Sequence, residues 1–338
     1  MISRVLLFAG FLALALSAPG QVSRPIGARP NGARQNKQPP IYVPPLLAHA
    51  IKAQPFLHYT GSYTSQLRTG ATIVDSQEFI TRAGEWYRID FPTDSKFAGQ
   101  VIIENNVLRQ HYQPNSNEIL QQPPKHGESW EKIANLANNR KLVLTTAQGD
   151  IVAGWKTEQL VVSDQQGNIQ QRLYIEPGSG LIMKRLIFDQ IGTQVGFFEF
   201  NQVNLSPKID QSIFTINRKG VKVITPLMQI QRVAKRRGFT VHYLPPSTGF
   251  QLEGGNYKKI ANVDAMVETY VDGKIRLWVY VLKAPIDPER LRQSANKNQH
   301  FYSFEANGET VVLLGNFPDA TLQHLAESMA NGTESLGH

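Results

Sequence analysis

The chain has no cysteine, and this absence excludes several kinds of structure and chemistry. Disulfide bonds cannot form, no thiolate can bind a metal or act as a nucleophile, and no lipid can be attached to a cysteine behind a signal sequence. The patterns HExxH and GxSxG and a glycine-rich phosphate loop are also missing. The eight histidines are scattered, with no pair at metal-ligand spacing. We therefore expect no metal, no other cofactor and no enzymatic activity.

Two features keep an enzyme as an open alternative. Ser129 and Lys132 have the SxxK spacing of serine acyl enzymes, but neither SDN nor KTG occurs in the chain. A pair of carboxylates for glycoside hydrolysis is defined by its separation in space, which spacing along the chain does not fix. Most acidic residues here are better explained as surface charges on strands.

Long apolar runs are scarce. The one clear run, residues 5–16, follows Arg4 and precedes small residues at 15–20, which is the pattern of a secretory signal peptide over residues 1–20. The run is well short of the roughly 20 residues that a membrane span needs, so an uncleaved anchor is the less favoured interpretation. We expect a periplasmic or otherwise exported protein that is soluble once the signal peptide is removed.

Acidic residues are absent from two segments in which basic residues gather. Residues 21–40 contain Arg24, Arg29, Arg34 and Lys37, and residues 217–238 contain seven basic residues. Together with Arg4, these cations exceed the formal net charge of +8, so the rest of the chain is mildly acidic. A basic segment outside the cytoplasm favours phosphate-bearing lipid, an anionic polymer or an acidic partner, and export argues against nucleic acid. Solvation of a tail and a linker is the simpler explanation of the same charges.

What the sequence does have is a series of β-rich runs separated by short turns. Between residues 149 and 214, apolar and β-branched runs alternate with glycine-containing turns at 164–168, 177–180 and 192. These connections are too short for parallel crossovers, so they predict an antiparallel meander that forms a curved sheet. Residues 151–162 are interpreted as one strand, with Gly154 at a bulge or at a close backbone approach.

The region before the meander adds more strands and two helices. Residues 58–67, 72–81, 85–91, 100–104 and 107–112 have strand character, with an alternation of period two at 85–91. Residues 46–52 and 130–138 have helical spacing. In the last part, residues 226–237 form an amphipathic helix between Pro226 and Gly238. Its apolar stripe is usually core packing, and membrane docking is the alternative.

The remaining residues predict a small second domain. Two hairpins turn at 271–273 and 307–308, and residues 318–329 form a terminal helix. The fold class is therefore α+β and mostly antiparallel β. We expect these segments: 1–20 signal peptide, 21–45 disordered basic Pro-rich segment, 46–216 half-barrel, 217–243 basic connector with a helix, 244–330 C-terminal domain and 331–338 disordered tail.

Short motifs give the chain a family resemblance. The first domain resembles the LolA-like exported lipid-binding half-barrels at residues 59–63 (YTGSY), 86–92 (WYRIDFP), 112–114 (YQP), 152–154 (VAG), 173–176 (LYIE) with 179–181 (SGL), and 198–200 (FEF). The second domain is similar to the C-terminal part of the RseB/MucB family at residues 244–245 (LP) with 249–250 (GF), 267–273 (VETYVDG), 314–318 (LGNFP) and 325–328 (LAES).

This resemblance implies a LolA-like half-barrel covered by helices and joined by a basic linker helix to a small sheet domain. It also implies a regulator of sigma factor activity in the envelope stress response. Such a protein binds a membrane-anchored anti-sigma factor and senses a lipid, a lipopolysaccharide-like ligand or a lipoprotein acyl chain. A LolA-like lipid or lipoprotein carrier with an accessory domain is the alternative. Peripheral contact with a membrane fits both.

Two sets of residues are the candidates for these roles. The predicted ligand groove contains Tyr87, Ile89, Phe91, Val101, Ile103, Trp130, Ile133, Leu173, Ile175, Met183, Phe198 and Phe200. The predicted partner surface contains Arg232, Lys235, Arg236, Arg237, Tyr270, Trp278 and Tyr280. Ordinary core packing is the alternative explanation for each apolar residue, because alternation shows which residues share a face but not which face is concave.

Overall fold

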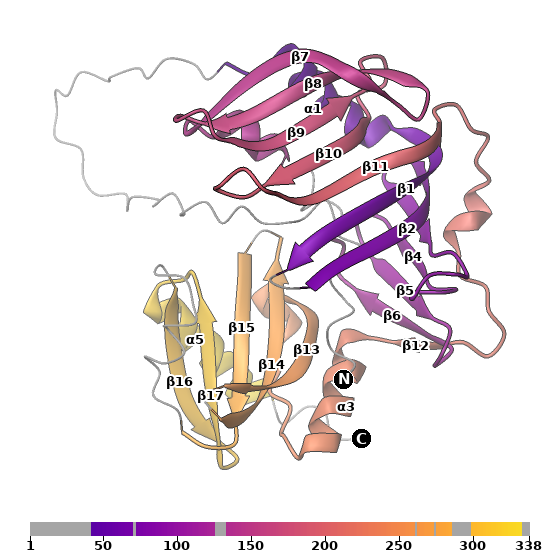
Figure 1. Cartoon of the computed structure of the whole chain (residues 1–338). Coiled ribbons are helices and arrows are strands. Elements are labelled where there is room, and N and C mark those ends of the chain that lie inside the picture. Colours follow the sequence, from indigo (N-terminus) through magenta and orange to yellow (C-terminus); the bar gives the residue numbers. More distant parts are fainter. Residues whose placement is uncertain are drawn as a thin grey trace, which may run out of the picture. The chain divides into compact units, whose positions relative to one another are not determined.

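The computed structural model describes residues 42–69, 72–125, 133–260, 262–273, 275–285 and 299–332 (Figure 1). The described residues form two compact units. The larger unit contains residues up to Ser116 and those of Pro124–Lys219, and the smaller unit contains Asn117–Pro123 and the residues from Gly220 onward. The predicted signal peptide and most of the basic Pro-rich segment lie outside the described residues, and the predicted domain boundaries stay predictions.

The larger unit is built on one open antiparallel sheet, with strands in the order β5-β4-β3-β2-β1-β11-β10-β9-β8-β7. The strands are β1 (His58–Thr69), β2 (Thr72–Ala83), β3 (Trp86–Asp90), β4 (Val101–Glu104), β5 (Arg109–Gln113), β7 (Leu142–Val152), β8 (Trp155–Asp164), β9 (Ile169–Ile175), β10 (Ile182–Phe188) and β11 (Gln194–Asn204). Its helices are α1 (Pro45–Ala53), the short 3-10 helices η3 (Gln54–Phe56) and η4 (Gln211–Phe214), and a helical stretch at residues 133–138.

Alternation along the strands explains why one face of this sheet is buried. On β2, Ser76, Glu78 and Ile80 are buried, whereas the intervening Gln77 and Phe79 are exposed. Successive residues of a strand point to opposite faces, so this pattern defines a buried face and a solvent-facing one. Strands β7 to β11 are connected as the predicted antiparallel meander.

The interpretation of residues 151–162 as a single bulged strand was wrong. Strand β7 ends at Val152, and Val152 pairs directly with Trp155 at the start of β8. Ala153 and Gly154 between them both have positive φ, 50° and 82°. Two consecutive residues with positive φ are the signature of a tight two-residue hairpin loop, so Gly154 forms part of a turn.

The smaller unit contains an antiparallel sheet in the order β13-β14-β15-β17-β16. These strands are β13 (Gln251–Ile260), β14 (Val263–Asp272), β15 (Ile275–Leu282), β16 (His300–Ala306) and β17 (Glu309–Gly315). The unit also holds the helices α3 (Pro226–Arg237), η5 (Pro246–Thr248) and α5 (Asp319–Gly332), and a parallel pair of short strands, β6 (Glu118–Gln122) with β12 (Lys222–Ile224).

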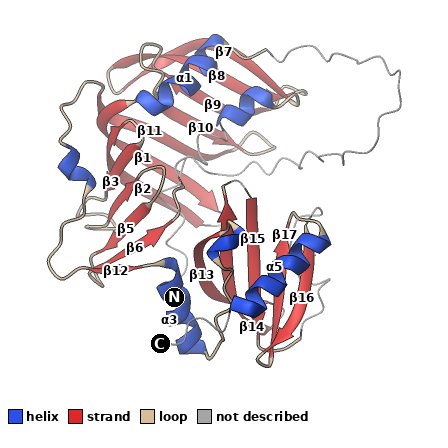
Figure 2. Ribbon diagram, turned by 180° about the vertical axis from the view of Figure 1, so that it is seen from behind, coloured by secondary structure: helices blue, strands red, loops and turns tan. Residues whose placement is uncertain are grey.

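Helices α3 and α5 pack on the small sheet. Figure 2 shows α5 lying across it, where Leu322, Leu325 and Met329 join a cluster with Tyr270 and Leu277. Helix α3 contributes Ile230 and Ala234 to a second cluster, together with Met266 and Val281 of the sheet. The helix begins as predicted, with the Thr225 hydroxyl accepting a hydrogen bond from the backbone N–H of Met228, and ends at Gly238, which has φ 71°. The α+β, mostly antiparallel fold class is confirmed.

Candidate functional site: the apolar face of the larger sheet

One face of the larger sheet carries a continuous apolar cluster, here called the apolar face. Its core contains Leu47 and Ala50 of α1, Ile102, Leu160 and most of the residues predicted to line a groove. The predicted residues in the cluster are Tyr87, Ile89, Phe91, Ile133, Leu173, Ile175, Met183, Phe198 and Phe200. All are less than 10% exposed, so the structure brings them together as buried neighbours.

Two short helical stretches cover this face. Helix α1 has nine residues, and the second stretch contributes Ile133, Leu136 and Ala137. The turn between β9 and β10 approaches α1 very closely at Gly180, where a Cβ atom would come within 2.9 Å of the Cβ of Ala53. Gly180 also has φ 72°, so glycine is favoured there for two independent reasons. Helix α1 therefore packs closely against the turn between β9 and β10.

Three predicted groove residues are not in the cluster. Val101 and Ile103 are buried, but the register pairs Ile89 with Ile102 and pairs Arg88 with Ile103, so Val101 and Ile103 point to the opposite face from Ile89. Ile102, which the prediction did not include, is the residue of β4 on the apolar face. The physical reason is the period of two along a strand, which separates neighbours onto opposite faces. Trp130 lies outside the described residues.

Polar groups on the same face were missed by the sequence analysis. Tyr63 packs against Phe198 and Phe200, and its hydroxyl donates a hydrogen bond to the fully buried carboxylate of Glu78. Ser76 also donates to Glu78, with 2.6 Å between the oxygens. Burial raises the pKa of Glu78. The Ser65 hydroxyl is fully buried and has no hydrogen-bond partner among the described residues.

A second polar group lies further along the face. Glu104 accepts hydrogen bonds from the Tyr87 hydroxyl at 2.8 Å and from Nη1 of Arg109 at 2.7 Å, and Arg109 also donates to Tyr87 at 3.1 Å. The Glu104 carboxylate is fully buried, and Arg109 is 4% exposed. Burial, and to a smaller extent the nearby charge of Glu104, raises the pKa of Tyr87 well above its ordinary value. The cost of burying these two charges is offset because each charge faces the opposite one and is hydrogen-bonded.

Two further ionisable groups, His111 and Arg185, are buried on the apolar face. Burial lowers the pKa of His111 to about 4, so its imidazole is neutral at pH 7, and it lies 2.7 Å from the side-chain oxygen of Gln100. Burial lowers the pKa of Arg185 to about 10, and its guanidinium donates to Gln171 at 3.0 and 2.7 Å. Arg185 pairs in register with Phe198 and therefore shares its face. The apolar face thus combines aliphatic and aromatic side chains with buried hydrogen-bonding groups.

The predicted partner residues divide into buried and exposed ones. Tyr270 is 1% exposed and donates to Glu268 at 2.8 Å, and Tyr280 is 8% exposed in the core, so neither presents its ring to a partner. Trp278 is half-buried. Arg232 forms an ion pair with Glu118 at 2.9 Å. The remaining predicted residues, Lys235, Arg236 and Arg237, are exposed.

The described residues offer neither a metal site nor a membrane-spanning helix. No group of three or more histidine, aspartate or glutamate side chains in those residues could hold a metal ion. Within the same part of the chain, no helix combines the length and the apolar content that a membrane span needs.

The described residues thus form an open half-barrel sheet and a small sheet domain packed with helices. No family model and no curated protein matches the chain. Among solved structures, the MucA/MucB complex of Pseudomonas aeruginosa is 16% identical, with a TM-score of 0.42, over 83% of this chain and 95% of that one. A structure of MucB alone is 17% identical, with a TM-score of 0.41, over 85% of this chain and 95% of that one.

A LolA superfamily protein of Nitrosomonas europaea matches part of the chain. It is 11% identical, with a TM-score of 0.27, over 51% of this chain and 96% of that one. The matches therefore include both groups of proteins that the sequence motifs resemble.

Proposed function

We propose that this protein is an exported, non-enzymatic regulator that senses an amphiphile at its apolar face and binds a membrane-anchored anti-sigma factor through its smaller unit. The observation that supports ligand binding is the apolar face itself, an extensive cluster on an open sheet that is closed by short helical stretches. The partner assignment follows from the RseB/MucB-like motifs in the sequence.

The covering helices are suited to displacement. Isolated helices shorter than about 12–15 residues are marginal in water, so α1, with nine residues, depends on its packing against the sheet. An acyl chain that took its place would keep the apolar face dry, and it would gain about 0.8 kcal/mol for each buried CH₂ group. We therefore propose that ligand entry replaces contacts made by the covering helices with contacts to the acyl chain.

The buried polar groups would orient such a ligand. An amphiphile has one polar end, and a site lined only by apolar side chains would not distinguish its two ends. Tyr63, Glu78 and Arg109 supply donors and acceptors at fixed places on the apolar face. The same groups make the face selective, because a ligand that leaves a buried polar group without a partner is penalised.

Regulation would follow from linkage between the two binding events. A ligand that prefers the partner-free state lowers the affinity for the partner by the same factor by which the partner lowers the affinity for the ligand. The anti-sigma factor would then be released when the amphiphile accumulates.

A pull-down from native envelopes tests this proposal. The mature protein is used as bait, and mass spectrometry identifies both the lipids and the proteins that are retained. We expect an amphiphile and an anti-sigma protein, with the yield of the second falling when excess amphiphile is added. Lipid without a protein partner would support the carrier alternative, and retention of neither would contradict both.

A further inference from the structure

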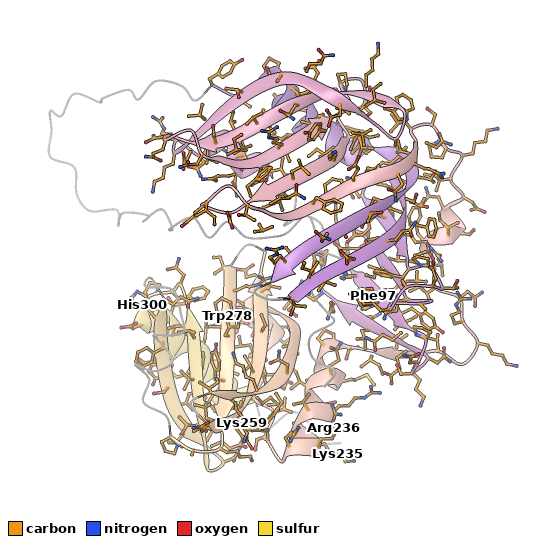
Figure 3. All side chains as sticks on the ribbon, viewed as in Figure 1. Phe97, Lys235, Arg236, Lys259, Trp278 and His300 are labelled. Atoms are coloured by element: carbon orange, nitrogen blue, oxygen red, sulfur yellow. The ribbon has the colours of Figure 1, made fainter. Side chains whose placement is uncertain are left out.

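Basic residues gather around the C-terminal end of α3. Lys235, Arg236 and Arg237 form its last turn, and Lys259 lies near the end of β13, the strand on which α3 packs. All four are exposed. Figure 3 shows Lys235, Arg236 and Lys259 toward the same end of the smaller unit. We call these four residues the basic end.

The acids that are near this end already have partners. Asp264 accepts a hydrogen bond from Tyr257 at 2.6 Å and lies 3.8 Å from Lys259. Glu309 accepts from Lys283 at 2.7 Å and from the backbone N–H of Thr240 at 2.9 Å. Lys235, Arg236 and Arg237 have no acidic partner among the described residues. The positive charge of the basic end is therefore largely uncompensated.

The basic end is held in a fixed orientation. Arg237 stacks on the ring of Tyr257 at 4.1 Å, and Lys283 donates a hydrogen bond to the backbone carbonyl of Gly238, directly after the helix. Ile230 and Ala234 anchor the apolar side of α3 in the core. A preorganised set of cations loses less entropy on binding than cations on a flexible tail.

The arrangement of the cations distinguishes between two kinds of anionic partner. Successive helical residues are separated by about 100° around the axis, so Lys235, Arg236 and Arg237 spread over about 200° of the helix end and do not form a stripe along one side. A stripe would follow an elongated acidic peptide, whereas cations spread around a helix end can meet a planar surface that is approached end-on.

The same geometry excludes the usual way in which an amphipathic helix binds a membrane. A helix that lies in the plane of the membrane inserts its apolar stripe among the lipids. The stripe of α3 is packed against Met266 and Val281 of the small sheet and is not available. Contact through the charged end alone remains.

We propose that the basic end docks the protein, end-on, onto the headgroups of an anionic phospholipid surface. Each Lys or Arg near such a surface contributes about 1 kcal/mol, so three or four cations give weak, reversible and salt-sensitive binding. Lys235, Arg236 and Arg237 also belong to the predicted partner surface, and the membrane contact would keep the regulator near any membrane-anchored protein.

Co-sedimentation of the full chain with vesicles tests the proposal. Vesicles of phosphatidylcholine containing phosphatidylglycerol are compared with vesicles of phosphatidylcholine alone, at low and high salt. We expect binding only to the anionic vesicles, and we expect salt to weaken it. The triple variant Lys235→Gln, Arg236→Gln, Arg237→Gln should bind about 100-fold more weakly. Glutamine keeps the helix propensity of these positions, and circular dichroism checks that the variant is folded.

The matched control removes the same number of charges from the larger unit. Lys141, Lys156 and Lys208 are exposed there, and the triple variant with Gln at all three positions should keep wild-type affinity. Equal losses in the two triple variants would show that only net charge matters and would overturn the proposal. So would equal binding to both kinds of vesicle. If the variant with glutamine at 235, 236 and 237 lost binding to a poly-glutamate probe but still bound the anionic vesicles, the basic end would instead be assigned to an acidic peptide.

Discussion

A Cβ atom on Gly255 would lie 2.6 Å from Cγ1 of Ile230, so β13 and α3 approach each other more closely here than any larger residue permits. The backbone oxygen of Val267 would be 2.9 Å from the same atom, so a shift of one side chain cannot remove both contacts. The close approach places α3, and with it the basic end, on the small sheet.

Gly255→Ala should therefore destabilise the smaller unit by about 1–3 kcal/mol, because overpacking forces the helix away from the strand. Thermal unfolding and hydrogen exchange of the α3 amides measure the effect. Gly178→Ala is the control, since the nearest atoms to its added Cβ would be side-chain atoms of Glu176, at 3.1 Å and beyond, and it should cost much less. Unchanged exchange in α3 would contradict the packing described.

Arg109→Met should destabilise the larger unit by about 3–5 kcal/mol, because it leaves the buried Glu104 carboxylate without its guanidinium partner. The double variant Arg109→Met, Glu104→Leu removes both charges and should recover most of the loss. Urea unfolding of the two single variants and the double variant gives the coupling. If the losses of unfolding free energy in the two single variants summed to the loss in the double variant, Arg109 and Glu104 would not be coupled.

Stability should depend on pH through Glu268. Burial raises the pKa of Glu268 from 4.5 to about 8, so the folded state keeps a proton that the unfolded state releases above pH 4.5. Between pH 4.5 and about 8, rising pH therefore lowers the free energy of unfolding by up to about 1.4 kcal/mol per pH unit. The stabilisation that comes from the raised pKa of Glu268 is fully present only below pH 4.5.

Glu268→Gln should flatten this dependence and leave the smaller unit more stable at pH 8 than the wild type. Chemical unfolding at several pH values between 4.5 and 8 measures it. Glu327→Gln, on the exposed side of α5, is the control and should retain the wild-type slope. If the unfolding free energy of Glu268→Gln fell with pH as steeply as that of the wild type, the pH dependence would have to come from another group.

Phe198→Asp should weaken the binding of a fluorescent acyl-chain probe while leaving the smaller unit folded, because it places a charge on the apolar face. Phe198→Leu keeps the site apolar and should bind the probe more strongly than the Asp variant. Circular dichroism of both variants checks that the larger unit is still folded. Phe79 is 47% exposed on the other face of β2, so Phe79→Asp should bind as the wild type does. Equal affinity in all four proteins would argue against the apolar face as the ligand site.

Local sequence patterns predicted the elements whose signal lies within a few residues. Helix α3 was predicted at its observed bounds, because Pro226, the apolar stripe and Gly238 mark its start, its face and its end. The hairpin of β16 and β17 was predicted from Asn307 and Gly308, and both have positive φ in the structure. In each case, the local conformation that these residues favour is the one the fold requires.

The features that depend on distant pairing were not predicted. Strands β6 and β12 pair in parallel although about a hundred residues separate them, and nothing within either segment indicates the other. The buried network of Tyr63, Glu78 and Ser76 was missed because glutamate at an alternating position usually marks the solvent face. Ser76, Glu78, Ile80 and Arg82 all occupy the buried side of β2, and alternation by itself shows only that such residues share a face.

Photo-crosslinking with an acyl chain that carries a diazirine tests the central claim most directly. After illumination of the full chain with the probe bound, mass spectrometry maps the labelled residues. We predict labels on the apolar face, at residues such as Phe198, Phe200 and Leu173, and competition by unlabelled amphiphile. Labels confined to the outer face around Phe79, or no saturable labelling, would contradict it.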